Sequence, residues 1–284
     1  MAKLRADVEG CGCVRCQQVE GTALQRSVTE SLQWSSRLVL ARPSIPAVFL
    51  GVGFLQLAVL LGPRELALVG ALLGVAGVFV GRGYVGVVGR ETLAQRNPSP
   101  ASALRTVFRR FPAFAGAALL VVALLGSTGL FVARVLSRPV RAALQAAGAS
   151  AFTTDVVVLL AVAASVLYLL LKFWFVPEAC FVGGYGPASA LRTSWQVTTL
   201  HRRKAFLVVA GFALLLGVGV ALDTRLANPE SPIALTIRYG ETTIVLRSFG
   251  LSFAGGVRFA FDMAVTALYS GVFVHHYVSG VFEA

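Results

Sequence analysis

The chain has 284 residues, of which 56% are hydrophobic and 13% are charged, and its mean hydropathy is +0.76. This composition excludes a water-soluble globular protein, because a core of this size could not bury so much apolar surface. The net charge of +12 would suggest nucleic-acid binding in a soluble protein. Basic cytoplasmic loops explain it better in a membrane protein, so we expect membrane lipids and no nucleic acid as partners.

The chain begins with a mixed, polar segment, residues 1–43, which we expect to be a cytoplasmic tail that can include an interfacial helix. It contains Cys11, Cys13 and Cys16, and three thiolates at this spacing are able to bind zinc, with Cys180 as a fourth ligand. The favoured alternative is reduced thiols in an unstructured arm, since no second cysteine pair or histidine follows at the usual spacing. We therefore predict no metal and no other cofactor.

Six apolar runs are long enough to span a bilayer, which takes about 20 residues. They are residues 44–62, 66–88, 113–133, 152–171, 205–222 and 250–274. Arg82 lies near the end of the second run, while Asp155 and Lys172 lie at opposite ends of the fourth. The pattern predicts an all-α bundle of six transmembrane helices over residues 44–279, followed by a short C-terminal segment, 280–284.

Lysine and arginine residues outside these runs are concentrated in three segments, namely the tail, residues 89–112 and residues 172–204. The segments between them carry fewer basic residues. Positively charged loops stay on the cytoplasmic side during insertion. The distribution therefore predicts a multi-pass protein of the cell membrane with both termini in the cytoplasm.

A heptapeptide, Pro-Ala-Ser-Ala-Leu-Arg-Thr, occurs unchanged at Pro100–Thr106 and Pro187–Thr193. Each copy precedes a predicted span, and a proline in the first turn is typical of a helix start. We expect both to form short interfacial helices with apolar sides toward lipid. In the first copy that side consists of Leu104, Val107, Phe108 and Phe111. A third, gapped copy near Ser31–Trp34 would make the chain three parallel units, each an interfacial helix plus two spans.

The segment from Val176-Pro-Glu178 through Gly184–Thr198 contains Pro-Glu, Gly-Pro, Ala-Leu-Arg and Ser-Trp just before an apolar helix. It resembles a prokaryotic family of six-span membrane domains of unknown function, which includes the membrane domain found beside glycerophosphodiester phosphodiesterases. The resemblance implies a membrane module. It implies no hydrolase activity, because a separate soluble barrel performs that chemistry in those proteins.

Two further segments carry weaker patterns. Gly70, Gly74, Gly77 and Gly81 lie on one face of the second span and predict close approach of another helix, from this chain or from a second copy. Residues 235–246 are rich in strand-forming residues around a Gly-Glu-Thr turn. A small hairpin is the alternative there to an ordered loop, which we favour slightly.

The sixth span carries a polar stripe on one helical face, Arg258, Asp262, Thr266, Tyr269 and His276. Charges facing lipid cost several kcal/mol, so we expect the stripe to face the bundle interior. A buried ion pair that joins helices is the favoured interpretation. A path for protons, ions or a polar substrate is the alternative.

Established enzyme motifs are absent from the sequence. We therefore expect a non-enzymatic membrane module or accessory protein, with another membrane protein or a second copy as its protein partner. A small transporter or channel that uses the polar stripe is the first alternative. A membrane enzyme acting on lipids is the second.

Overall fold

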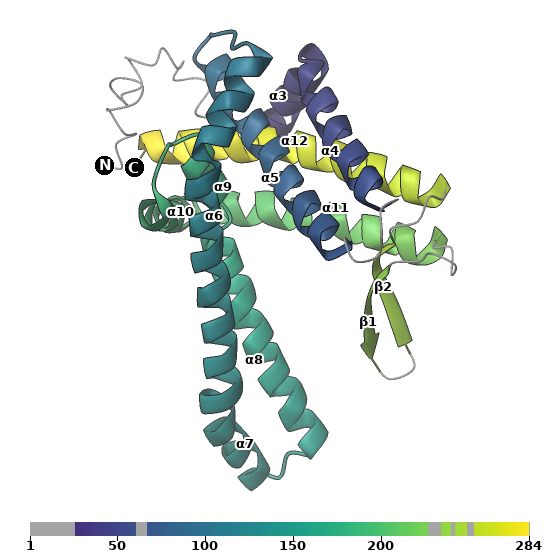
Figure 1. The fold of residues 1–284 in the computed structure, drawn as a ribbon. Coiled ribbons are helices and arrows are strands. Elements are labelled where there is room, and N and C mark those ends of the chain that lie inside the picture. Colours follow the sequence, from purple (N-terminus) through teal and green to yellow (C-terminus); the bar gives the residue numbers. More distant parts are fainter. Residues whose placement is uncertain (1–25, 61–66, 227–233, 240–241, 249–252, 284) are drawn as a thin grey trace.

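The computed structural model describes residues 26–60, 67–226, 234–239, 242–248 and 253–283 of the chain (Figure 1). Nearly all of these residues are helical, as the composition led us to expect. One group of helices cross one another, and one long helical hairpin, called the arm below, projects away from this group (Figure 1).

Five helical segments are long and apolar enough to cross a bilayer, so the chain is a helical membrane protein. They are Leu72–Leu93, Pro100–Ala146, Ala151–Phe181, Arg202–Ala221 and Val257–Val281. A sixth crossing requires Val28–Ala41 and Ser44–Leu55, which are bent by 78° to each other, to form one broken span. Against the predicted six spans, the described residues therefore supply five or six.

The arm is built from four consecutive elements, α6 (Pro100–Phe131), the π-helix η2 (Val132–Leu136), α7 (Ser137–Ala146) and α8 (Ala151–Lys172). Ser99 and Ser150 start its two long helices, because each side chain accepts a hydrogen bond from a first-turn backbone N–H. At the tip, Arg141 forms an exposed ion pair with Asp155 at 2.9 Å. The arm is thus closed at its tip by local contacts.

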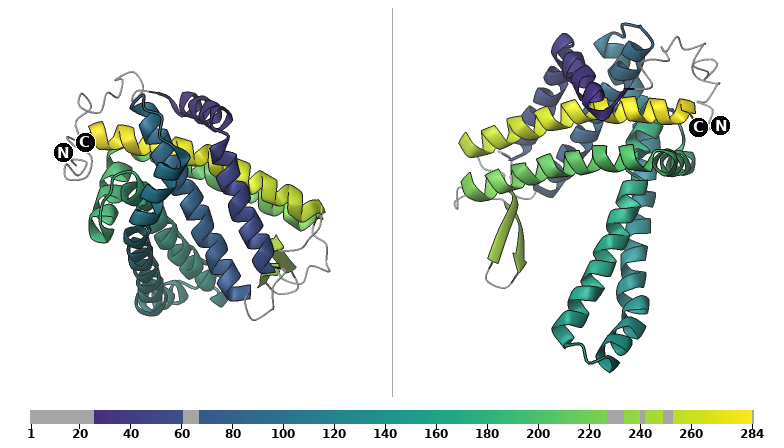
Figure 2. Two further views of the ribbon diagram at one scale, coloured as in Figure 1. Left: turned by 45° about the horizontal axis from the view of Figure 1, so that its top comes forward. Right: turned by 180° about the vertical axis from the view of Figure 1, so that it is seen from behind.

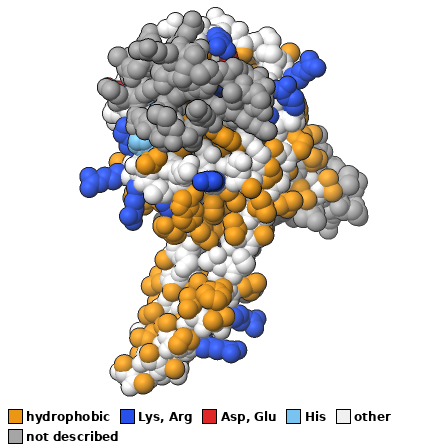
Figure 3. Space-filling view, turned by 90° about the vertical axis from the view of Figure 1, so that its left-hand side faces the viewer, with side chains coloured by type: hydrophobic (Ala, Val, Ile, Leu, Met, Phe, Trp, Pro, Cys, Tyr) orange, Lys and Arg blue, Asp and Glu red, His pale blue; other side chains and the backbone are white. Residues whose placement is uncertain are grey.

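The arm leaves most of its apolar residues outside the protein core. Only 6% of the residues in the apolar windows of its two long helices are buried, against 56% in α5 (Ala67–Leu93) and 67% in α12 (Phe253–Glu283). Basic side chains lie toward the tip and near the root, and hydrophobic side chains cover the length between them (Figure 3). That distribution is typical of a segment whose middle is surrounded by hydrocarbon.

Helix α11 (Arg202–Leu226) and α12 run side by side in opposite directions (Figures 1 and 2). The chain between them forms an antiparallel hairpin of β1 (Ala234–Tyr239) and β2 (Thr242–Ser248). The favoured prediction of an ordered loop is therefore wrong, and the alternative describes the segment. The strand-forming residues on both sides of the turn pair with each other, with an irregularity between Leu235 and Thr236.

The arm and the α11/α12 pair are steeply inclined to each other in Figure 1 and in the right-hand view of Figure 2. In this arrangement they cannot both stand along the normal of one bilayer. One of the two hairpins therefore lies obliquely in the membrane when the other is upright.

The predicted tail ends in a well-formed helix, α3 (Val28–Ala41), which is followed by α4 (Ser44–Leu60) and α5. Ser27 and Glu30 form a reciprocal capping box at the start of α3. Ser35 Oγ donates a hydrogen bond to the carbonyl oxygen of Leu268 in α12 at 2.5 Å. The capping box thus stabilises the start of α3, and the bond from Ser35 fixes the helix to α12.

The two copies of the heptapeptide begin α6 and α10 (Pro187–Leu200), with prolines in both first turns. Ala103 and Ala190, at the same position of the two copies, are buried, and so are Val107 and Ser194, the residues that directly follow the copies. Only α10 is a separate short helix, because the backbone of His201 leaves the helical region there.

The prediction of a separate interfacial helix for the first copy is wrong. Helix α6 runs unbroken for 32 residues and continues through Pro112. Its apolar side is also divided, since Val107 is fully buried in the protein core while Phe108 is exposed. The repeat therefore produces two helix starts with a common buried face and different continuations.

Ser194 fixes α10 against the end of α8. Its hydroxyl donates to the carbonyl oxygen of Lys172 at 2.8 Å and accepts from the backbone N–H of Phe175 at 3.2 Å. Ser194 is fully buried, so no solvent replaces these partners.

We expect Ser194→Ala to destabilise the protein by about 1–3 kcal/mol, because a buried N–H loses its acceptor. Thermal unfolding of the purified protein in detergent measures the change. Ser127→Ala is the matched control, since Ser127 is exposed and its hydroxyl bonds only within its own helix, to the carbonyl oxygen of Leu124. Equal melting temperatures for the two variants would contradict the assigned role of Ser194.

Candidate functional site

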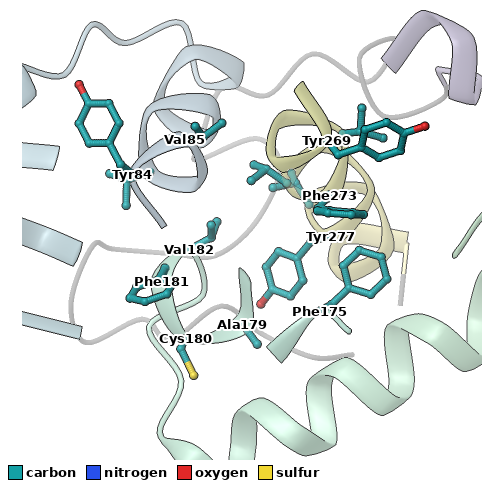
Figure 4. Close-up of a cluster of buried hydrophobic side chains, with 14 of the residues drawn as sticks. Tyr84, Val85, Phe175, Ala179, Cys180, Phe181, Val182, Tyr269, Phe273 and Tyr277 are labelled. Carbon is teal, nitrogen blue, oxygen red and sulfur yellow. The ribbon is translucent and has the colours of Figure 1, made fainter. Parts of the chain in front are cut away.

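A short helix, α9 (Val176–Phe181), lies at the centre of the described structure, and all six of its residues are buried. Aromatic side chains of α5 and α12 surround it (Figure 4). Glu178 in its first turn forms two hydrogen bonds with Arg82 of α5. Arg82 Nε donates to Oε1 at 2.6 Å, and Nη2 donates to Oε2 at 2.8 Å. A bidentate pair of this geometry is among the strongest polar contacts in proteins.

The guanidinium group of Arg82 makes three more contacts. Nη2 also donates to the carbonyl oxygen of Trp174 at 2.9 Å. The carbon of the group lies 4.5 Å from the ring centroid of Phe273 and 5.5 Å from that of Trp174. The ion pair is thus enclosed by aromatic rings, and Glu178 is only 2% exposed. A carboxylate bound in this way is held as a structural anchor and is not accessible to a substrate.

Two more arginines hold the end of α9. Arg90 Nη1 donates to the carbonyl oxygen of Val182 at 3.2 Å, and Arg110 Nη1 donates to the carbonyl oxygens of Phe181 and Val182. Cations at a helix C-terminus satisfy free carbonyl groups and interact favourably with the helix dipole. Arginines from α5 and α6 therefore bind both ends of α9, which ties the arm to the core.

The turn after α9 depends on Gly184, which has φ +66°. A Cβ atom at this position would lie 3.3 Å from Arg110 Nη2. Glycine therefore suits both the backbone conformation and the close approach of the guanidinium group. The next residue, Tyr185, is half-buried, and this burial raises the pKa of its hydroxyl.

The sequence interpretation did not recognise this arrangement. In the sequence, Arg82 is only a charge near the end of the second apolar run, and Glu178 is only part of the Pro-Glu motif. A general signal existed, because an arginine inside a span requires a buried acceptor or acid. The chain has only 13 acidic residues, and Glu178 adjoins an apolar span.

The polar stripe of the sixth span lies on α12, on the side of that helix that faces α11. A Cβ atom at Gly219 would lie 2.3 Å from the guanidinium group of Arg258, and one at Gly211 would lie 2.8 Å from the hydroxyl of Tyr269. The ring of His276 lies 5.9 Å from that of His201. Two glycines of α11 thus make room for polar side chains of α12. Of the five stripe residues, Thr266 is half-buried and the other four are buried.

Arg258 and Asp262 form a hydrogen-bonded ion pair of 2.9 Å within α12. Arg258 Nη1, Asp262 Oδ1 and His276 Nε2 are buried and have no hydrogen-bond partner among the described residues. The neighbouring His275 faces α3, where its Nδ1 lies 3.2 Å from Ser31 Oγ. Within the described residues, the stripe therefore contains one ion pair and three buried polar atoms that form no hydrogen bond.

The other candidate residues are dispersed. Cys180 is fully buried in α9, whereas Cys11, Cys13 and Cys16 lie outside the described residues. Where the structure is described, no cluster of three His, Cys, Asp or Glu side chains could share a metal ion.

The glycines of the second span pack against the preceding helix. A Cβ atom at Gly77 would lie 2.7 Å from Val52 of α4, and one at Gly81 would lie 2.7 Å from Phe49. Helix α4 of the same chain therefore supplies their close partner. Gly74 is buried, and the surroundings of Gly70 lie outside the described side chains.

Comparison with protein families, with curated proteins and with solved structures finds no match for this chain.

Proposed function

We propose that the chain is a non-enzymatic accessory protein of the cell membrane that binds another membrane protein through the arm. The arm carries the proposal. Two of the five spanning segments leave nearly all of their apolar windows outside the protein's own core, while more than half of each window in α5 and α12 is buried in it. Long apolar helices that their own chain leaves uncovered offer a large surface to a neighbour in the bilayer.

The use of the buried charges supports the same proposal. Arg82 and Glu178 neutralise each other, and Arg90 and Arg110 bind backbone carbonyl groups of the α9 turn. These charges hold helices together and leave no acid or base aimed at a substrate. With the basic loops in the cytoplasm, the root of the arm and both termini lie on the inner face and the tip of the arm lies outside.

Site-specific photo-crosslinking in native membranes tests the proposal. A photoreactive amino acid at Leu119 or Leu160, both exposed on the arm, is expected to give one discrete protein adduct. The same group at Val107, which is fully buried, serves as the control and should give none. Lipid adducts alone at both arm positions would overturn the proposal.

A second candidate function is supported by the three unpaired polar atoms of α12. Arg258 Nη1, Asp262 Oδ1 and His276 Nε2 keep free hydrogen-bonding capacity among the described residues. Buried atoms of this kind need an explanation, and a pathway for protons or ions is one.

Proton flux into proteoliposomes decides between the two functions. For an accessory protein, we expect an imposed proton gradient to decay no faster than in protein-free liposomes. A transporter would give faster decay that Asp262→Asn abolishes. Asp155→Asn is the matched control, because Asp155 is exposed at the arm tip and pairs there with Arg141. Proton flux that is lost in Asp262→Asn and kept in Asp155→Asn would contradict the accessory role and support the transport function.

A further inference from the structure

Lys172, the last residue of α8, is a buried cation without an acidic partner. It is 6% exposed, and its Nζ donates a hydrogen bond to Thr199 Oγ1 at 2.7 Å. The ammonium group lies 5.1 Å from the ring centroid of Trp195 and 5.6 Å from that of Tyr168. None of the ion pairs formed by described residues includes it. An ammonium group has three donors, and among the described residues only one of them finds an acceptor.

The surroundings of Lys172 add positive charge. Arg202 acts on it as a like charge, and Arg203 and Lys204 follow in the exposed first turn of α11. No described carboxylate pairs with any of these three cations. A cluster with this charge at the root of an apolar arm attracts an anion at the level of the lipid headgroups.

A shallow groove between α6 and α8 lies on the arm, and its lining residue Tyr168 is one helical turn from Lys172. It is lined by Thr128, Ala164, Ser165, Tyr168 and Leu169. Ser165 and Lys172 are seven residues apart and therefore lie on one face of α8. Tyr168 lines the groove and also contacts both the Lys172 ammonium group and the edge of Trp195. The groove and the basic cluster are thus parts of one continuous surface.

We infer that this surface binds an anionic glycerophospholipid, with its phosphodiester at Lys172, Thr199 and Arg202 and an acyl chain in the groove. The phosphate oxygens accept hydrogen bonds from the free ammonium donors and from the guanidinium group. A zwitterionic headgroup fits less well, because its own cation would meet Arg203 and Lys204. This binding site is additional to the proposed protein-binding role of the arm and does not depend on it.

Native mass spectrometry of the purified full chain tests the inference, with added phosphatidylglycerol or phosphatidylcholine of equal chain length. We expect phosphatidylglycerol to bind about tenfold more tightly, and Lys172→Met to remove about that factor. Lys204→Met is the matched control, since it removes one charge from the exposed part of the same cluster. It should lower the affinity by much less.

A second variant addresses the groove without changing any charge. Ala164 is exposed, so Ala164→Trp is expected to fold and to fill the groove. It should weaken binding of long-chain phosphatidylglycerol while leaving a short-chain analogue unaffected. Melting temperatures of all variants are measured alongside, and if Lys172→Met does not fold, the groove variant decides the result.

Three results would overturn the inference. Equal losses in Lys172→Met and Lys204→Met would indicate general charge attraction with no defined site. Unchanged lipid binding in Ala164→Trp would exclude the groove. Displacement of the lipid by millimolar inorganic phosphate would indicate a site for a soluble anion instead.

Discussion

Glu178→Ala is expected to destabilise the protein by about 3–5 kcal/mol, the largest effect of any single substitution proposed for this chain. The change leaves the Arg82 guanidinium group buried among aromatic rings without its carboxylate. It also frees the first turn of α9, which joins the arm to the core. Thermal unfolding in detergent, followed by size-exclusion chromatography of the heated sample, measures the loss.

The repeat supplies a matched control for this substitution. Glu91 lies nine residues before Pro100, as Glu178 lies nine residues before Pro187. Its ion pair with Arg96 is longer, 3.6 Å, and the arginine is half-exposed. Such pairs contribute about 0–1 kcal/mol, so Glu91→Ala should be nearly neutral.

A double variant separates charge from packing. Arg82→Met combined with Glu178→Met removes both charges and retains apolar volume, which is often nearly neutral for buried pairs. We expect it to be more stable than Glu178→Ala alone. A double variant as unstable as the single one would show that packing, and not the unpaired charge, determines the loss.

Gly271→Ala is expected to cost about 1–3 kcal/mol by separating α3 from α12. A Cβ atom at Gly271 would lie 2.1 Å from Ser35 Oγ, 2.8 Å from Ser35 Cβ and 3.4 Å from the backbone at Ser35 Cα. Because backbone and Cβ atoms cannot move aside as a side-chain tip can, α3 must shift as a whole. The hydrogen bond from Ser35 to Leu268 would then be lost.

The readout combines melting temperature with the rate of trypsin cleavage after Arg37 in α3, which should rise. Gly217→Ala in α11 is the control, because nothing lies within 4 Å of the added Cβ atom. Its higher helix propensity should leave stability unchanged or raised by up to about 1 kcal/mol. Equal behaviour of the two alanine variants would contradict the close contact at Gly271.

Hydrophobic run length and proline placement were sufficient to predict the helical membrane class and the helix starts at Pro100 and Pro187. Both signals depend only on residues close together in the sequence, so tertiary contacts do not alter them. The continuation of α6 through Pro112 was not predictable in this way, because neighbouring helices decide whether a proline ends a helix. An ordered loop was preferred to the β1/β2 hairpin for a related reason. Pairing between strands depends on register as well as on composition, and composition alone does not give the register.

The candidate site was predictable only in part. Helical periodicity placed the stripe from Arg258 to His276 on one face of α12, but it could not identify α11 as the facing helix. The contact between Arg82 and Glu178 joins residues 96 positions apart, and no periodic pattern reports a contact of that range. Lys172 was recognised as a boundary residue, whereas its position between Tyr168 and Trp195 requires the fold of α10.

The contacts between α11 and α12 limit how the molecule can move. Arg258 faces Gly219, Tyr269 faces Gly211, and His276 faces His201. From Arg258 to His276 the chain runs forward along α12, while the facing positions run backward from Gly219 to His201, the residue before α11, as expected for antiparallel helices. Contacts of this kind therefore recur at three levels of the helix pair. Sliding one helix along the other would break all three contacts at once, so we expect the pair to resist piston-like motion of α12. In any large rearrangement we therefore expect α11 and α12 to move together as one rigid body.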